Sequence, residues 1–420
     1  MNAIWSRQAK YERWKDVEIA ICEAHAQDGA IPPEALATIK KKAAFTLERC
    51  DVIEQETRHD LMAFVRCLSE NIGPDGRYVH MGVTSYDVID TALGMMLRDS
   101  CTVLIQSCSG LRNAVAKLAR EHAATPMIGR THGIHAEPIT FGFKLSNWVA
   151  ELDRNIARLE AARDEVAYGK ISGAVGVHAI TSPDLEKRVC EALGLKPDPA
   201  TTQIITRDRH GNFLNVVALL GACLERIATE LRNLQRTEIL EVQEAFASGQ
   251  TGSSAMPHKR NPWNSETVAG LARILRANAH AMLESVATWH ERDLTNSSVE
   301  RIVFPDSCYL ADFMLNKLTT IVKGLQVFPE TMMANLRKMG DLVFSEHVMI
   351  ALIHAGMSRE EAYKVAQRNA AKAWEGADFK ASVESDPDVQ RLLSKDQVEE
   401  LFSLDHHLRN AKHTLEAVGV

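Results

Sequence analysis

Three long seams of apolar residues constrain the fold of this chain more than any other feature of its sequence. Apolar positions recur in each seam at steps of three and four residues, the spacing of one face of an α-helix. The first seam consists of Leu97, Cys101, Leu104, Cys108, Leu111, Val115 and Leu118. The second consists of Phe213, Val217, Leu220, Leu224, Ile227, Leu231 and Leu234. The third, which is less strict, consists of Leu145, Trp148, Leu152, Ile156, Leu159 and Val166. Helices of this length bury one another's stripes in a bundle.

The seams and the residues around them predict an all-α fold in three parts. Residues 1–92 are expected to form an N-terminal helical domain and residues 93–341 a central long-helix bundle. Residues 342–420 are expected to form a C-terminal domain of short helices with charged surfaces. Strand signals are sparse throughout. A single chain of this kind has more apolar helix surface than it can bury within itself, so part of that surface is expected to contact other subunits.

Composition excludes several classes of function. The 420 residues are 45% hydrophobic and 25% charged, which is ordinary for a globular protein. The net charge of −7 argues against a large nucleic-acid footprint. No apolar run reaches membrane-spanning length, and the N-terminus lacks the apolar region of a signal peptide. Because the eight cysteines include no Cys-x-x-Cys pair, reduced thiols and a cytoplasmic location are expected.

Residues 249–262 form the most informative stretch of the sequence. Its glycines free the backbone and its prolines restrict it again, so the stretch is predicted to be a loop. The loop combines hydroxyls beside exposed N–H groups with two cations and an amide. These residues are Ser253, Ser254, Lys259, Arg260 and Asn261. Such a concentration of donors suits an anion, although composition alone is equally typical of a polar surface loop.

The order Gly-Ser-Ser-Ala-Met-Pro-His-Lys-Arg-Asn-Pro within this loop resembles the mobile loop of the fumarase/aspartase superfamily. Its variant here is most similar to the adenylosuccinate lyase family. The resemblance implies β-elimination of fumarate from adenylosuccinate and from the succinyl-aminoimidazole-carboxamide ribotide, without a metal or organic cofactor. It also implies a homotetramer in which four subunits share one helical core and each active site is built from three chains.

The block Thr57-Arg58-His59-Asp60 matches the same family. It leads into apolar positions at helical spacing, so His59 is expected on a helix near several charges. Alone, such a histidine is more often a surface or packing residue. The resemblance places His59 in the active site.

The next block begins at His80 and includes paired hydroxyls at Thr84 and Ser85. Either hydroxyl can cap the helix that follows, and hydroxyls at a helix N-terminus form a natural carboxylate site. The resemblance implies that His80, Thr84 and Ser85 bind the substrate. Tyr86 stands where the family pattern predicts threonine or another small polar residue.

Residues 129–138 contain Thr131 and His132 between a glycine and a proline, so they are predicted to be an irregular connection before a helix. Histidines in loops flanked by glycine are better functional candidates than helical ones. His132 and His135 could suggest zinc, but no third ligand follows nearby, so no metal is expected. The resemblance makes His132 the general acid and Thr131 a substrate contact.

Later blocks complete the site that the resemblance implies. Gln203 would contact the substrate, and Glu266 would steer His132. Ser297 and Arg301 lie four residues apart, so on a helix both face one point and suit a phosphate, as they do in the family. An exposed polar helix face explains their spacing equally well.

In the central loop, the resemblance implies that different residues stabilise the substrate carboxylate and remove the proton beside it. Lys259 and Asn261, with loop N–H groups, would receive the negative charge that develops there, and Ser254 would bind the substrate. Ser253 would be the base, since donors in a closed loop can hold its alkoxide away from water.

One departure and two rival interpretations remain. Relatives usually carry an Arg-Tyr segment that grips the phosphate just before a Met-x-Ala-Ile-Trp stretch, whereas residues 1–5 here are Met-Asn-Ala-Ile-Trp. Either the natural start lies upstream, or the phosphate is held differently, or the substrate differs.

The rivals are a sister enzyme of the argininosuccinate lyase or carboxymuconate cycloisomerase type, and a helical scaffold without turnover. Incubation with adenylosuccinate and then with argininosuccinate, with fumarate followed by ultraviolet absorbance, would separate them.

Overall fold

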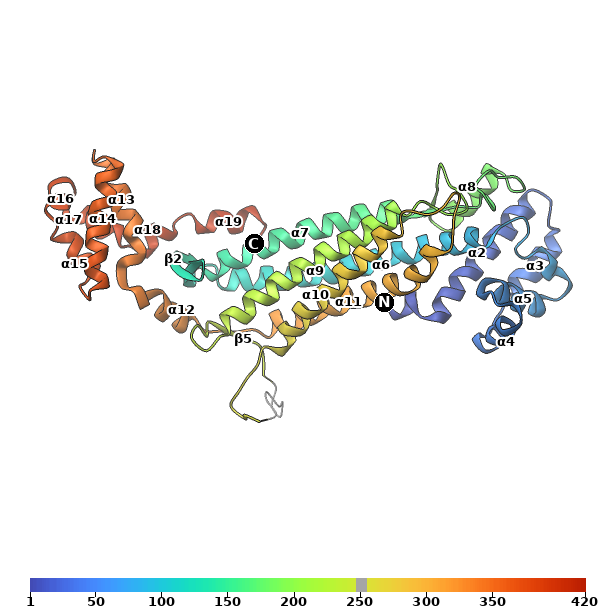
Figure 1. The fold of residues 1–420 in the computed structure, drawn as a ribbon, viewed down its shortest axis with the longest axis horizontal. Helices are drawn as coiled ribbons and strands as arrows, with labels where there is room; N and C mark the ends of the chain where they lie inside the picture. Colours follow the sequence, from blue (N-terminus) through green and yellow to red (C-terminus); the bar gives the residue numbers. More distant parts are fainter. Residues whose placement is uncertain (247–254) are drawn as a thin grey trace. The chain divides into compact units, whose positions relative to one another are not determined.

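A computed structural model describes residues 1–246 and 255–420 of the chain, and it is built almost entirely of helices (Figure 1). The helices of the first half are α1 (Asn2–Trp5), α2 (Arg7–Gln27), α3 (Pro33–Lys42), α4 (Leu47–Thr57), α5 (Asp60–Ile72), η1 (Pro74–Tyr78), α6 (Ser85–Glu121), α7 (Phe141–Val166), α8 (Pro183–Ala192) and α9 (Asp208–Leu234). Those of the second half are α10 (Trp263–Glu284), α11 (Thr295–Lys323), α12 (Pro329–Leu336), η2 (Arg337–Phe344), α13 (Ser345–His354), α14 (Arg359–Trp374), α15 (Phe379–Glu384), α16 (Pro387–Leu392), α17 (Lys395–Leu401), α18 (Leu404–Leu408) and α19 (Ala411–Ala417).

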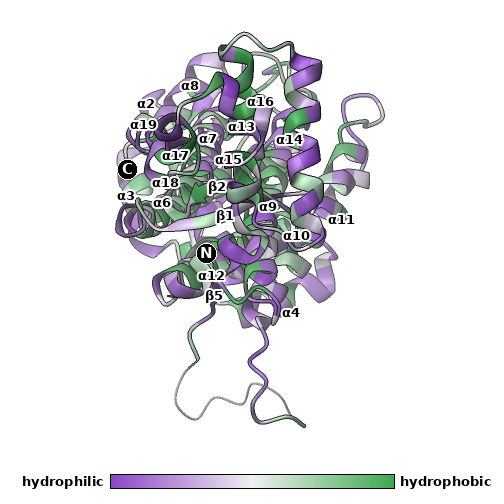
Figure 2. Ribbon diagram, turned by 90° about the vertical axis from the view of Figure 1, so that its left-hand side faces the viewer, coloured by the Kyte–Doolittle hydropathy of each residue, from purple (hydrophilic) through white to green (hydrophobic). Residues whose placement is uncertain are grey.

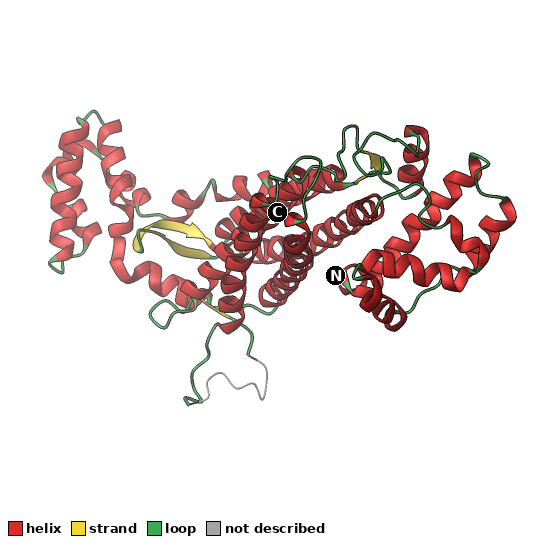
Figure 3. Ribbon diagram, turned by 45° about the vertical axis from the view of Figure 1, so that its right-hand side comes forward, coloured by secondary structure: helices red, strands yellow, loops and turns green. Residues whose placement is uncertain are grey.

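The strands are short and pair only in twos within the described residues, so the predicted all-α class is confirmed (Figure 3). They are β1 (Pro126–Thr131) with β2 (Ile134–Thr140), β3 (Tyr168–Gly169) with β4 (Lys196–Pro197), and β5 (Val242–Gln243) with β6 (Gln326–Val327). No helix in the part of the chain that the structure describes is both long and apolar enough to cross a bilayer.

The chain divides into two compact units, each made of three stretches. Unit 1 comprises Met1–Ser109, Arg154–Leu224 and Gly270–Asn316, and unit 2 comprises Gly110–Asp153, Glu225–Ala269 and Lys317–Val420. The five long helices α6, α7, α9, α10 and α11 contribute residues to both units. Each unit is therefore assembled from segments that are far apart in the sequence.

The predicted seams are the buried faces of long helices. Every residue of the first seam on α6 and of the second on α9 is buried, which confirms both. The third seam on α7 is buried except at Ile156, which is half-buried, while the neighbouring Asn155 is buried instead. The helices carry both hydrophobic and hydrophilic segments (Figure 2), as expected for helices that bury one face.

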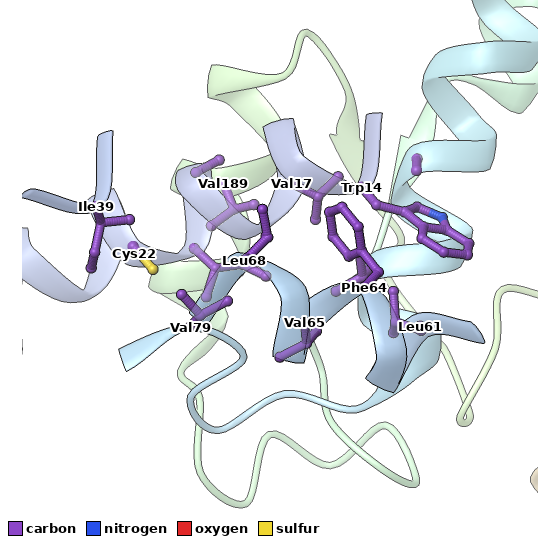
Figure 4. Packing of buried hydrophobic residues seen from close by; sticks show 14 of the residues in the cluster. Trp14, Val17, Cys22, Ile39, Leu61, Phe64, Val65, Leu68, Val79 and Val189 are labelled. Atoms are coloured by element: carbon purple, nitrogen blue, oxygen red, sulfur yellow. The ribbon is translucent and has the colours of Figure 1, made fainter. Parts of the chain in front are cut away.

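Unit 1 also contains an aromatic cluster that fixes α2 against α5. The ring centroids of Tyr11 and Trp14 lie 4.6 Å apart, and Phe64 packs edge-on at 5.5 Å and 5.7 Å from them. Leu61, Leu68 and other aliphatic side chains surround these rings (Figure 4). This packing holds the N-terminal end of α5 in place, which matters because His59 lies there.

Two local predictions were wrong. His59 does not lie on a helix: α4 ends at Thr57, Arg58 turns the backbone with a φ of 53°, and His59 caps α5. Residues 129–138 are not irregular but belong to the antiparallel β1–β2 hairpin. A bulge between Ile128 and Arg130 and a proline within β2 obscure the alternation by which strands are recognised, so the sequence hid this hairpin.

Candidate active site

Unit 1 contains a cavity of about 570 Å³ where several of the predicted site residues meet. Its lining comes from the start of α5, the start of α6, the segment before α9, and α11 with the residues preceding it. Among the lining residues are His59, Thr84, Ser85, Gln203, Ser297 and Arg301. These residues span 242 positions of the sequence, and the fold of unit 1 collects them around one space.

The capping position of His59 orients its ring. Its Nδ1 accepts a hydrogen bond from the Met62 N–H at 3.5 Å, which leaves the proton of the neutral ring on Nε2. Nε2 lies 3.4 Å from the Ser85 hydroxyl, at the start of α6. His59 therefore presents a donor, and Ser85 a hydroxyl, to the same cavity.

Thr84 and Ser85 are held by the first turn of α6. The Thr84 N–H donates to the Asp87 carboxylate at 2.7 Å, and the same carboxylate pairs with the buried Lys170. Because Asp87 satisfies these groups, the two hydroxyls remain at the cavity edge rather than being consumed by the helix cap. Within the described residues neither hydroxyl caps α6, contrary to the capping interpretation of the sequence, so both are available to a substrate.

His80 lies outside the residues that line this cavity. Its Nδ1 bonds Glu18 on α2 at 2.7 Å, and its backbone N–H donates to the same carboxylate at 2.9 Å. Burial works against a charged ring, but the bond and charge of Glu18 outweigh it and raise the pKa of His80. The geometry ties the left-handed turn at His80 (φ 63°) to α2.

A buried ion network sets the spacing between the elements of the cavity. Arg207 is fully buried and donates to Asp90 on α6 at 2.8 Å and to Glu300 on α11 at 2.7 Å. It also donates to the Ile205 carbonyl at 2.6 Å. One guanidinium thus connects both helices that carry the cavity's hydroxyls. No local sequence pattern indicates this pairing, because its members are 117 and 93 residues apart.

Arg292 is a candidate site residue to which the sequence analysis gave no role. Its guanidinium carbon lies 3.5 Å from the centroid of the Tyr86 ring, and its Nη1 donates to the Gln203 side chain at 3.0 Å. Its buried Nε and Nη2 have no hydrogen-bond partner within the described residues. The signal was Tyr86 itself, because an aromatic ring in place of a small polar residue provides a surface on which a guanidinium stacks.

Unit 2 holds the other predicted residues in two places. His132 and Gly133 form the two-residue turn of the β1–β2 hairpin, both with positive φ (55° and 79°), and Thr131 precedes them. Lys259, Asn261 and Glu266 line a cavity of about 750 Å³ to which His132 does not contribute. Ser253 and Ser254 lie outside the described residues.

The hairpin that carries His132 is anchored by residues the sequence analysis did not select. Arg130 makes a two-pronged contact to buried Glu241 at 2.7 and 3.0 Å. His407 on α18 bonds the Pro138 carbonyl at 2.9 Å and the ring of His347 on α13 at 2.8 Å. The C-terminal helices, in which no catalytic cluster was expected, therefore support the strand that follows His132.

No group of three His, Cys, Asp or Glu side chains in the described residues is arranged to hold a metal ion. The cavities are instead lined by hydroxyls, amides and fixed cations. Such donors bind and orient anions, and the histidines can transfer protons.

Comparison with known proteins shows that the chain is a lyase. A family model described as "Lyase" matches residues 1–275, and one described as "Adenylosuccinate lyase C-terminus" matches residues 341–418. The adenylosuccinate lyase of Synechocystis is 50% identical over 412 residues, covering 98% of this chain and 96% of its own. That of Bacillus subtilis is 43% identical over 421 residues, covering 100% and 98%. The chain belongs to the adenylosuccinate lyase family.

Solved structures confirm the superfamily fold. The fumarate lyase of a Mesorhizobium species superposes with a TM-score of 0.90 at 29% identity, covering 100% of this chain and 96% of that one. The 3-carboxy-cis,cis-muconate lactonizing enzyme of Pseudomonas putida has a TM-score of 0.89 at 28% identity, covering 100% and 95%. Both are less similar in sequence than the adenylosuccinate lyases, so fold similarity does not favour the sister-enzyme interpretation.

Proposed function

We propose that the chain cleaves adenylosuccinate to AMP and fumarate, and the succinyl-aminoimidazole-carboxamide ribotide in the same way. A base removes a proton from the carbon next to a carboxylate, its electrons form the C=C bond of fumarate, and the C–N bond breaks as the nitrogen is protonated. The observation that carries the proposal is sequence identity of 43–50% to adenylosuccinate lyases over nearly the whole chain, together with the donor-lined cavity of unit 1.

The proposed site residues divide between binding and proton transfer. Thr84, Ser85, Gln203, Ser297 and Arg301 supply hydroxyl, amide and guanidinium donors for the anionic nucleotide. His80 and Thr131 are also proposed to contact the substrate, as the family pattern implies. The donors of unit 1 face the cavity before substrate arrives, so little reorganisation accompanies binding.

The proton transfers are assigned to Ser253, His132 and His59, of which His59 lines that cavity. Ser253 is the proposed base, and Lys259, Asn261 and Ser254 stabilise the charge on the carboxylate. His132, steered by Glu266, protonates the leaving nitrogen, and His59 assists from the side of unit 1. His132 is exposed at a hairpin tip, where it is accessible to a substrate held by another chain.

We propose a homotetramer with shared sites and a cytoplasmic location. Part of the exposed apolar surface supports association: Ile302, Tyr309 and Phe313 lie along α11 and are 66%, 36% and 46% exposed. A stripe of this kind on a long helix suits contact with another copy. The eight cysteines are free and buried, as suits a reducing compartment.

The test is fumarate release followed by ultraviolet absorbance. The protein is incubated in parallel with adenylosuccinate and with argininosuccinate, which can release fumarate, and with carboxymuconate, whose cyclisation to a lactone releases none and is followed as the loss of its own ultraviolet absorbance. Turnover of adenylosuccinate alone supports the proposal. Turnover of argininosuccinate or carboxymuconate in its place establishes a sister enzyme, and no turnover of any of them supports the scaffold interpretation.

A further inference from the structure

Unit 1 contains a second cavity, of about 290 Å³, beside the one that gathers the site residues. The two cavities share Asp60, Tyr86, Ser297 and Arg301 in their linings. The second cavity also reaches α2, whose side chain Lys10 lines it. Its volume accommodates a small anionic group with several waters, since a water occupies about 30 Å³ in the liquid.

Most charged groups of the second cavity are already paired within the protein. Arg301 donates to Asp60 at 2.8 Å, and Glu300 accepts from Arg207 at 2.7 Å. Arg7 makes an ion pair with Asp51. Lys10 is the remaining cation of the lining, and these contacts do not involve it.

Lys10 is half-buried, and its ammonium has neither a hydrogen bond nor an ion pair with any residue that the structure describes. Its Nζ lies 4.7 Å from the Trp14 ring centroid and 5.4 Å from that of Tyr11. Burial lowers the pKa of Lys10, and of its charged neighbours Asp60 raises it while Arg301 lowers it. An ammonium that is partly removed from water and close to a second cation gains from an anionic ligand.

We propose that Lys10 binds the phosphate group of the nucleotide together with Ser297 and Arg301. The identity of the anion rests on the proposed function, whereas the assignment of Lys10 rests on the cavity. A tetrahedral phosphate accepts from a guanidinium fork, a hydroxyl and a compact ammonium at once, and Arg301, Ser297 and Lys10 supply these donors in the lining of this space. The rings of Tyr11 and Trp14 already position the Lys10 ammonium, so little side-chain freedom is lost on binding.

Asp60 provides a second test of this assignment, because its substitution should change the affinity for phosphate in the opposite direction. In the structure it neutralises Arg301, and a bound phosphate would have to share that guanidinium with it. Removing the charge of Asp60 frees Arg301 for the phosphate. Lys10→Met and Asp60→Asn are thus expected to change the affinity for the phosphate in opposite directions.

The experiment compares AMP with adenosine, which differ only in the phosphate. Dissociation constants for both are measured by ligand-detected NMR on the full-length protein, and KM and kcat are measured with adenylosuccinate. The variants are Lys10→Met, Lys10→Arg and Asp60→Asn. The matched control is Lys15→Met, because Lys15 is on the same helix, pairs with Glu12 and does not line the cavity.

Lys10→Met is expected to weaken AMP about 10- to 100-fold, the loss of one charged hydrogen bond, and to leave adenosine unchanged. KM should rise by a similar factor with kcat within a few-fold. Lys10→Arg should recover most of the affinity for AMP, and Asp60→Asn should increase that affinity. Lys15→Met should bind AMP as the wild type does.

Unchanged AMP binding in Lys10→Met would overturn the proposal, as would an equal loss for AMP and adenosine. A wild-type protein that releases no fumarate from adenylosuccinate would instead overturn the proposed function. In that case the comparison of AMP with adenosine still decides the role of Lys10.

Discussion

The backbone at His132 has the left-handed φ of 55° that a two-residue hairpin turn requires. Histidine and asparagine tolerate this conformation better than most side chains, so His132→Asn removes the imidazole with little strain. The exposed side chain contributes little to packing, which separates its chemistry from its structural effect.

At the residue scale, replacing the proposed acid or the proposed base should nearly abolish turnover. His132→Ala, His132→Asn and Ser253→Ala are each expected to lower kcat by about 10²- to 10⁴-fold, the usual contribution of general acid–base catalysis. Circular dichroism should match the wild type in all three variants, and the melting temperature should do so in His132→Asn, which tolerates the left-handed turn.

His354→Asn provides the control for this prediction, since His354 ends α13 and lines none of the three cavities described above. Wild-type rates in the variants at 132 or 253 would remove the corresponding role. A large loss in His354→Asn would show that the assay responds to histidine substitution in general.

At the scale of the helix, two glycines of α6 make a matched pair. A Cβ at Gly94 would lie 2.2 Å from the Tyr168 carbonyl oxygen, so α6 can approach β3 only because the side chain is absent. A Cβ at Gly110 would meet nothing within 4 Å.

Gly94→Ala is therefore expected to destabilise the protein by about 1–3 kcal/mol, because backbone must move to relieve the overlap. Gly110→Ala is expected to stabilise it by about 0.5–1 kcal/mol, since glycine inside a helix costs conformational entropy. Thermal melts at one protein concentration compare them. Equal shifts in the same direction would contradict the packing assigned to Gly94.

The first turn of α9 supplies a prediction about pH. His210 is buried beside Phe304, and burial, followed by the charge of Arg207, lowers the pKa of His210 to about 3. The unfolded chain binds this proton near pH 6.5 and the folded chain does not. The stability from the neutral ring is therefore complete above pH 6.5 and is lost progressively as the pH falls towards 3.

For this one group, acidification from pH 7.5 to 5.5 should cost about 1.4 kcal/mol of unfolding free energy. Urea denaturation of the wild type and of His210→Leu at both pH values, with protein concentration fixed, measures that difference. His210→Leu is expected to lose about 1.4 kcal/mol less unfolding free energy than the wild type between pH 7.5 and pH 5.5. An identical acid loss in both proteins would exclude His210 as its source.

At the scale of the whole molecule, the apolar stripe of α11 tests the proposed assembly. Ile302→Asp should separate the tetramer, because a carboxylate buried in an apolar contact is strongly disfavoured. Size-exclusion chromatography with light scattering should show smaller species, and activity should fall with them if sites are shared. Tyr363→Asp, at an exposed position on α14, is the control. A fully active monomer would contradict the shared-site proposal.

The sequence predicted the helices well and their junctions poorly. Seam positions such as Leu104 and Leu220 are buried as expected, because a helix repeats every 3.6 residues and its pattern is local. The β1–β2 hairpin was missed because its bulge and Pro138 interrupt the alternation of strands. The supporting roles of His407 and Arg207 were missed because each depends on a partner far along the chain. The division at residues 92 and 341 stays a prediction.

The sequence by itself determined the helical class, the family and the chemical groups of the central loop. These depend on local periodicity and on residue order, and both are properties of one stretch at a time. Only the tertiary structure decided that Arg301 meets Asp60 across 241 positions, that Tyr86 stacks on Arg292, and that Lys10 lines a cavity with Ser297. Such meetings follow from the packing of helices, since burying apolar faces brings together polar ends that have no pattern in common.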